Sequence, residues 1–217
     1  MTTNVRRVAR GLGVLFVAAA LAVLANVAWQ LWGTGIATAR AQHRLAQQFQ
    51  AAPAARVAPA PQAAAASPSA DVLPARGAAQ PSVPLGTVVA HLVIPKIGVN
   101  YYVVEGVGSS QLAEGLGHYP GTAPVGGAGN VGIAGHRTTH GAPFYNLNEL
   151  RPGDLIHLTN TAGQTFTYGV TTLFVVPPSD GAVLNPTPKP SLTLTTCNPR
   201  YSATQRLIVQ AALETTG

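Results

Sequence analysis

The sequence contains a single cysteine, Cys197, among 217 residues, and only 9% of its residues are charged. One cysteine cannot form a disulfide within the chain, and it cannot build a cysteine-rich zinc site. Disordered chains combine low hydrophobicity with high net charge, whereas 47% of this chain is hydrophobic. These shortages exclude a disulfide scaffold, a cysteine-rich structural zinc protein and a wholly disordered chain.

Acidic residues are also scarce, which leaves a formal net charge of +6 at pH 7. The positive excess lies in residues 1–84, which hold seven arginines and one acid, Asp71. Residues 85–217 hold six lysines and arginines and six acids, so this region is neutral. Because no basic surface remains there for a phosphate backbone, we expect no nucleic acid partner.

The N-terminal region contains one long apolar run, residues 11–29, with no charged side chain. As a helix it would be about 28 Å long, close to the roughly 30 Å hydrocarbon core of a bilayer. Three arginines within residues 1–10 predict a cytoplasmic N-terminus, a single-pass anchor over 11–32 and an extracellular remainder. A cleaved signal peptide is the alternative, with a small-residue site at 37–39, but the length of the run favours an anchor.

A change of composition follows the apolar run. Residues 51–84 hold 14 alanines and 7 prolines and almost no large apolar side chains. Such a segment cannot bury enough apolar surface to offset its ordering entropy. We therefore predict an extracytoplasmic tether over residues 33–84 that is disordered apart from a short helix at 36–50.

Residues 85–217 form a region long enough for one compact core. Seven segments rich in Val, Thr, Tyr and Leu, bounded by Gly, Pro or Asn, are predicted strands: 87–94, 101–106, 130–134, 154–159, 164–176, 191–197 and 206–213. Two short helices are predicted at 109–116 and 143–150. Many short strands at this spacing favour a mainly β fold, a closed barrel or a sandwich, over alternating strands and helices.

The lone cysteine ends the predicted strand 191–197 and is followed by Asn198 and Pro199. An isolated cysteine is usually a small buried apolar residue. Two features of Cys197 favour a chemical role. A free thiol in an exported chain is exposed to oxidation and mispairing, and the edge between strand and loop is where active-site groups concentrate.

A cysteine nucleophile needs a group that transfers its proton. Two of the six histidines, His136 and His140, lie in the string GIAGHRTTHGAPF, and His136 directly follows a predicted strand. Acyl transfer also needs a donor for the developing oxyanion. Arg206 begins the strand after the cysteine loop, and Arg200 lies within that loop, so spacing alone leaves both arginines as candidates.

These residues resemble the sortases, membrane-anchored cysteine transpeptidases of Gram-positive cell surfaces. The string TLTTC at 193–197 matches the family signature T-L-x-T-C, with an arginine nine positions later and a Gly-His pair about sixty positions earlier. The wider strings HYPGTAPVGGAGNVGIAGHRTTHGAPF and TTCNPRYSATQRLIV are most similar to class E, with class D next. The resemblance covers residues 86–213.

The resemblance implies a closed eight-stranded β-barrel with short helices over a catalytic domain at residues 85–217. It implies that Cys197 is the nucleophile, His136 the catalytic histidine and Arg206 the catalytic arginine. It also implies that Thr196 and Tyr119 contribute to substrate binding.

The implied reaction cleaves a C-terminal sorting signal, LAXTG or LPXTG, between Thr and Gly through a thioacyl intermediate. The surface protein that bears the signal would then be transferred to an amine of a cell-wall precursor. Some class A sortases bind calcium through clustered acids, but the six acids here are scattered, so we expect no metal and no other cofactor. The alternatives are a hydrolytic cysteine peptidase on the same site and a non-enzymatic anchored β-domain that binds wall material or a partner protein.

Overall fold

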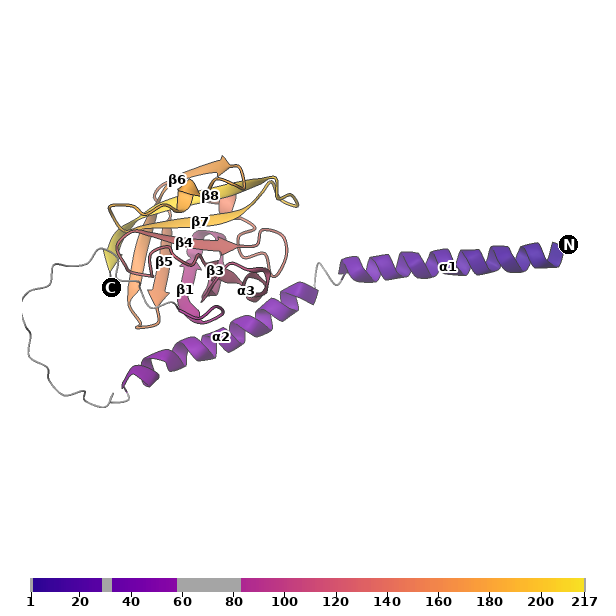
Figure 1. Cartoon of the computed structure of the whole chain (residues 1–217), viewed down its shortest axis with the longest axis horizontal. Helices are drawn as coiled ribbons and strands as arrows, with labels where there is room; N and C mark the ends of the chain where they lie inside the picture. Colours follow the sequence, from indigo (N-terminus) through magenta and orange to yellow (C-terminus); the bar gives the residue numbers. More distant parts are fainter. Residues whose placement is uncertain (1, 29–32, 58–82, 217) are drawn as a thin grey trace, which may run out of the picture.

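The computed structural model describes residues 2–28, 33–57 and 83–216. Two helices, α1 (Thr2–Ala28) and α2 (Thr34–Val57), precede a β-barrel in the chain (Figure 1). Among the described residues α1 alone is long and apolar enough to cross a membrane, and its Arg10–Val27 stretch of 18 residues is fully exposed. The predicted anchor over 11–32 is therefore helical and without protein cover along the part described here, and its residues 29–32 lie outside the described part of the chain.

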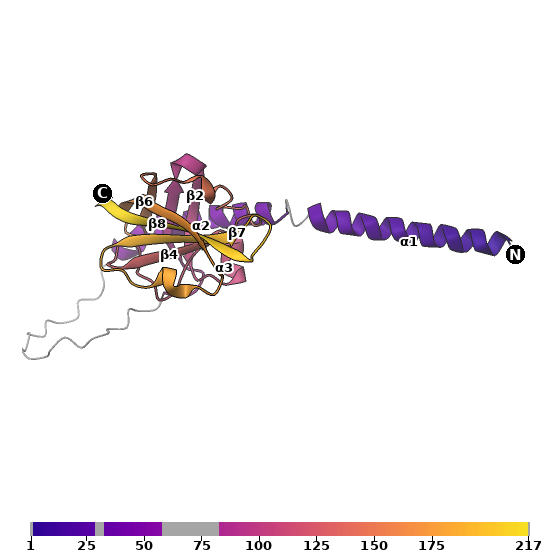
Figure 2. The ribbon, with the colours of Figure 1, turned by 90° about the horizontal axis from the view of Figure 1, so that it is seen from above.

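The barrel contains eight strands, which close in the order β1-β2-β3-β4-β7-β8-β6-β5. Their bounds are β1 Val88–Ile94, β2 Val99–Glu105, β3 Leu116–His118, β4 Asn130–Gly135, β5 Leu155–Asn160, β6 Thr165–Val176, β7 Ser191–Asn198 and β8 Gln205–Thr216. The β2–β3 and β4–β7 pairs are parallel, and the other pairs are antiparallel. Figure 2 shows β4, β7 and β8 side by side along one wall. The closed eight-stranded barrel predicted from the sequence is confirmed.

The short helices differ in part from the prediction. The segment predicted as a helix at 109–116 forms α3 (Ser109–Glu114), and its last residue already belongs to β3. The segment predicted at 143–150 forms only one 3-10 turn, η3 (Leu147–Glu149). Two further 3-10 turns, η2 (Pro95–Ile97) and η4 (Gly181–Leu184), lie in loops.

The barrel interior is filled by one face of each long strand, as the alternation of buried positions along β1 shows. The segment between β4 and β5 adds three fully buried side chains to this core, Phe144, Leu147 and Leu150. These residues belong to the chain that leaves the end of β4. The core therefore also fixes the segment that begins at His136.

The predicted tether begins as a helix. Residues 34–57 form α2, which packs beside β1, β2 and α3 (Figure 1). Its Leu45 is 1% exposed and packs with Val88 and Val104 in a small second core. The first half of the predicted tether over 33–84 is therefore ordered against the barrel, and residues 58–82 lie outside the described part of the chain.

Candidate active site

Three neighbouring strands carry the three residues expected to be catalytic. His136 directly follows β4, Cys197 lies near the end of β7, and Arg206 is the second residue of β8. Strands β4 and β7 run parallel with Ala134 opposite Thr195, and Cys197 lies directly opposite Arg206 in the antiparallel β7–β8 pair. The cysteine strand thus lies between the histidine strand and the arginine strand at one end of the barrel.

Two hydrogen bonds lock the ends of β4 and β7 together around His136. The hydroxyl of Thr196 donates to the backbone oxygen of Gly135 at 2.8 Å. On the other side, Arg137 Nη1 donates to the backbone oxygen of Cys197 at 3.1 Å. Thr196 is only 3% exposed, and its side chain joins the end of β7 to the end of β4. The implied contribution of Thr196 to substrate binding stays a prediction.

The side chains of Cys197 and Arg206 share one face of the sheet, because directly opposite residues of an antiparallel pair do so. Cys197 is a half-buried free thiol. Arg206 is half-buried and donates to the backbone oxygens of Ala203 at 2.9 Å and Gln205 at 3.0 Å. These bonds hold the guanidinium at the start of β8.

Arg200, the other candidate arginine, binds the segment between β4 and β5. It donates to the backbone oxygen of Tyr145 at 3.2 Å, and its guanidinium carbon lies 4.1 Å from the centre of the Tyr145 ring. It also donates to the side chains of Asn146 and Asn148. The geometry therefore pairs Arg206, and not Arg200, with the cysteine.

Both candidate histidines lie in the site. The rings of His136 and His140 stack with their centres 4.6 Å apart at an interplanar angle of 22°. Burial lowers the pKa of His136, and the nearby His140 lowers it further. This environment favours the neutral imidazole of His136.

Arg137 is a site residue that the sequence analysis missed. It is 5% exposed, and besides the Cys197 carbonyl it donates to Asn198 Oδ1 at 2.7 Å and to Asn148 Oδ1 at 2.9 Å. Among the described residues no carboxylate lies within salt-bridge distance of it. Burial, followed by the charge of Arg200, lowers the pKa of the Arg137 guanidinium. Its position next to His136 was the only sequence signal that could have drawn attention to it.

Tyr119 is the first residue of the loop that follows β3, and its side chain reaches β7. Its hydroxyl is 2.9 Å from Thr195 Oγ1, and Thr195 shares the alternating strand face with Cys197. The base of this loop is fixed by a buried contact of 2.7 Å between His118 Nδ1 and Glu105 Oε2. The structure thus brings Tyr119 to the strand face that carries the thiol.

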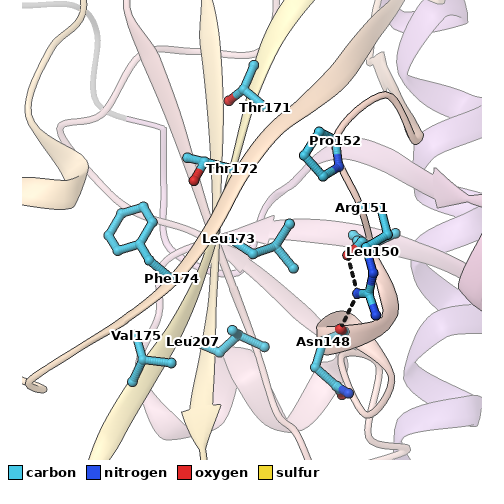
Figure 3. Close-up of a pocket in the computed structure, with 10 residues that line it drawn as sticks. All are labelled: Asn148, Leu150, Arg151, Pro152, Thr171, Thr172, Leu173, Phe174, Val175 and Leu207. Atoms are coloured by element: carbon cyan, nitrogen blue, oxygen red, sulfur yellow. Dashed lines mark hydrogen bonds between the residues drawn. The ribbon is translucent and has the colours of Figure 1, made fainter.

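A separate open hollow of about 400 Å³ lies between β6 and residues 148–152 (Figure 3). Leu173, Val175 and Leu207 line its apolar side, and Arg151 donates to the backbone oxygens of Asn148 and Leu150 at its rim. None of the five predicted site residues lines it. Within the described ranges, no group of three or more His, Cys, Asp and Glu side chains is placed to hold a metal ion.

The structure is a closed barrel in which the cysteine strand lies between the strands of the histidine and the arginine. This is the arrangement expected from the resemblance to the sortases. A family model described as a sortase domain matches residues 92–214. The chain belongs to the sortase family.

Individual relatives refine this assignment. Sortase SrtE1 of Streptomyces coelicolor is 32% identical over 216 residues, covering 92% of this chain and 55% of that protein. The chain thus spans about half the length of this curated relative. Among solved structures, sortase E of Streptomyces avermitilis is 40% identical with a TM-score of 0.57, covering 62% of this chain and 93% of that one. A Clostridium perfringens sortase D5 transpeptidase is 36% identical with the same TM-score, covering 61% and 82%. The predicted likeness to class E is confirmed.

Proposed function

We propose that this chain is a membrane-anchored cysteine transpeptidase. It cleaves a C-terminal sorting signal of the LAXTG or LPXTG type between Thr and Gly, and it transfers the surface protein to an amine of a cell-wall precursor. The observation that carries the proposal is the placement of Cys197 on β7 between the strand that leads to His136 and the strand that carries Arg206.

In the first half-reaction, Cys197 Sγ attacks the carbonyl carbon of the signal threonine. His136 takes the thiol proton and delivers it to the glycine nitrogen as the C–N bond breaks. The carbonyl oxygen becomes an oxyanion in the tetrahedral intermediate, and the guanidinium of Arg206 donates to it. The products are the released peptide, which begins with the signal glycine, and a thioester on Cys197.

In the second half-reaction, the acceptor amine attacks the thioester carbon and His136 removes the amine proton. The lowered pKa of His136 suits this step, because a neutral imidazole is the form that accepts a proton. The C–S bond then breaks and the thiol is restored. One amide bond is broken and one is formed, so the cycle needs no ATP.

The helix α1 is the anchor in this proposal. Its Arg10–Val27 stretch is apolar and uncovered, as a lipid-facing helix must be. The arginines within residues 1–10 orient this N-terminal segment toward the cytoplasm. The barrel, part of the catalytic domain at 85–217, then lies outside the cell.

The test uses the full chain in detergent micelles with an LAXTG peptide, an LPXTG peptide and a small primary amine. Mass spectrometry should detect the ligated product and a thioacyl adduct on Cys197. Cys197→Ala should form neither. An absence of ligated product, or equal product from the alanine variant, would refute the proposal, and cleavage without transfer to the amine would identify a hydrolase.

A further inference from the structure

The loop after His136 has a strained backbone. Three consecutive residues adopt positive φ angles, His140 at 53°, Gly141 at 73° and Ala142 at 46°. Side chains with a Cβ disfavour this left-handed region, and two of these residues carry one. Such a conformation persists only where surrounding contacts impose it.

The first turns of α2 supply part of those contacts. The backbone N–H of His140 donates to Thr34 Oγ1 at 3.4 Å. A Cβ placed on Gly141 would lie 2.9 Å from the hydroxyl of Tyr101 and 3.6 Å from the methyl carbon of Thr38. Tyr101 also donates to the backbone oxygen of Gly141 at 3.2 Å. The loop is therefore held closely between α2 and β2.

The docking of α2 does not depend on this loop. The amide of Gln42 donates to the backbone oxygens of Glu114 at 2.8 Å and Tyr102 at 3.2 Å, and it accepts from Tyr102 N at 2.7 Å. One turn further on, Leu45 is buried against β1 and β2. Near the loop, the buried hydroxyl of Thr38 donates to the backbone oxygen of Ala113 at 2.8 Å.

The loop in turn connects α2 with the candidate catalytic histidine. The ring of His140 stacks on the ring of His136 at 4.6 Å. The backbone N–H of Phe144 donates to the backbone oxygen of His136 at 3.1 Å and so closes the loop on the fully buried Phe144. One end of the loop is fixed by the core, and the middle is fixed by α2 and Tyr101.

We propose that α2 is a positioning element of the active site: it holds residues 139–142 in the conformation that stacks His140 on His136. The catalytic importance of this stacking rests on the function proposed above, because that function assigns proton transfer to His136. The stacking itself does not depend on the assignment. The helix that follows the membrane span is then a working part of the enzyme.

The test weakens the docking of α2 through residues that do not contact the loop, and it uses the full chain in detergent micelles. The double variant Gln42→Ala/Leu45→Ala removes the main docking contacts, and Gln47→Ala/Gln50→Ala changes two exposed residues of the same helix as the matched control. Hydrogen exchange at the Tyr102 amide, which donates to Gln42, reports release of the helix. The docking variant should show faster exchange at Tyr102, and the control should not.

Two readouts follow the consequence of release. In histidine-labelled protein, the imidazole resonances of His136 and His140 should shift in the docking variant, because stacked rings shield one another. The kcat for ligation should fall at least threefold with a smaller change in KM. The control should retain the wild-type resonances and kcat.

Faster exchange at Tyr102 with unchanged resonances of both histidines would overturn the inference, whatever the activity. Shifted resonances in a chain that performs no ligation would support it while contradicting the proposed function. Thr38→Val is the second variant, in case the double variant fails to fold. It keeps the methyl group next to Gly141 and removes the hydrogen bond to Ala113. Faster exchange of the Gly115 amide, which follows α3, would report that this contact is lost. Unchanged histidine resonances in such a chain would count against the inference.

Discussion

Arg137 Nη1 donates to the backbone oxygen of Cys197 at 3.1 Å, so the residue next to one candidate catalytic side chain holds the strand that carries the other. The same guanidinium binds Asn148 Oδ1 in the segment that leads to β5. It therefore ties together the end of β7 and the segment between β4 and β5. Hydrogen bonds from a charged donor are worth about 1.5–3 kcal/mol each, and here they are shielded from water.

We expect Arg137→Lys to lower kcat about tenfold or more with a smaller effect on KM. Lysine cannot reproduce the planar fork that reaches three acceptors, and small displacements of reacting groups are costly. Steady-state ligation kinetics measure both constants. Arg151→Lys is the control, because Arg151 donates to the backbone oxygens of Asn148 and Leu150 and not to the end of β7. A wild-type kcat for Arg137→Lys would show that the hydrogen bond from Arg137 to the Cys197 backbone oxygen is dispensable.

The two arginines of the β7–β8 region should differ sharply. We expect Arg206→Lys to lower kcat by about 10²–10³, the loss typical of removing one oxyanion donor. Arg200→Lys should have a much smaller effect, because Arg200 contacts Tyr145 and its neighbours. The rate of thioacyl-enzyme formation in a single turnover measures the loss in each of the two variants. A larger loss for Arg200→Lys would reassign the oxyanion role.

His136 should titrate below its ordinary value of 6.5, because burial and His140 both lower its pKa. His140→Gln should raise the midpoint of His136 without restoring the ordinary value, since the burial remains. In the unfolded chain His136 binds its proton at the ordinary pKa. The folded chain should therefore lose stability as the pH falls through 6.5 toward the lowered value. An NMR titration of labelled histidine measures the midpoint, and a value above 6.5 would contradict this account.

Tyr168 offers a test of core energetics away from the site. Its hydroxyl is buried without a hydrogen-bond partner among the described residues, and burial raises its pKa to about 12. Tyr168→Phe should stabilise the fold by about 1 kcal/mol, because it removes an unpaired polar group at nearly constant shape. Tyr119→Phe is the matched control and should destabilise it, because that hydroxyl is bonded to Thr195. Thermal unfolding measures both, and a lower Tm for Tyr168→Phe would indicate a hidden partner.

The long strands could be predicted to within about two residues at most ends, because β6 and β7 are continuous runs of β-branched and apolar side chains bounded by turn residues. The three residues expected to be catalytic could be selected because a short signature and its spacing mark them. By contrast β3 contains only Leu116, Gly117 and His118, too few for alternation to be visible. Its pairing with β2 and β4 is imposed by the closure of the barrel.

The role of Arg137 could not be predicted for a related reason. It depends on the parallel pairing of β4 with β7, which joins residues about sixty positions apart. The docking of α2 was equally hidden, since few of its side chains are buried and two of its polar ones, Thr38 and Gln42, make the specific contacts. Periodicity detects apolar faces, and it does not detect a polar contact with a backbone edge.

The docking of α2 also limits the distance between the end of α1 and the candidate active site. The last residue of α1 is Ala28 and the first of α2 is Thr34, which contacts the loop beside His136. The chain from Ala28 to Thr34 contains six residue steps, so these two residues can be at most about 22 Å apart. If α1 is the membrane anchor, as proposed, Thr34 and the loop beside His136 would lie within about 22 Å of the end of the membrane-spanning helix. Under the proposed function, this short connection would favour an amine acceptor close to the membrane surface over one deep in the wall.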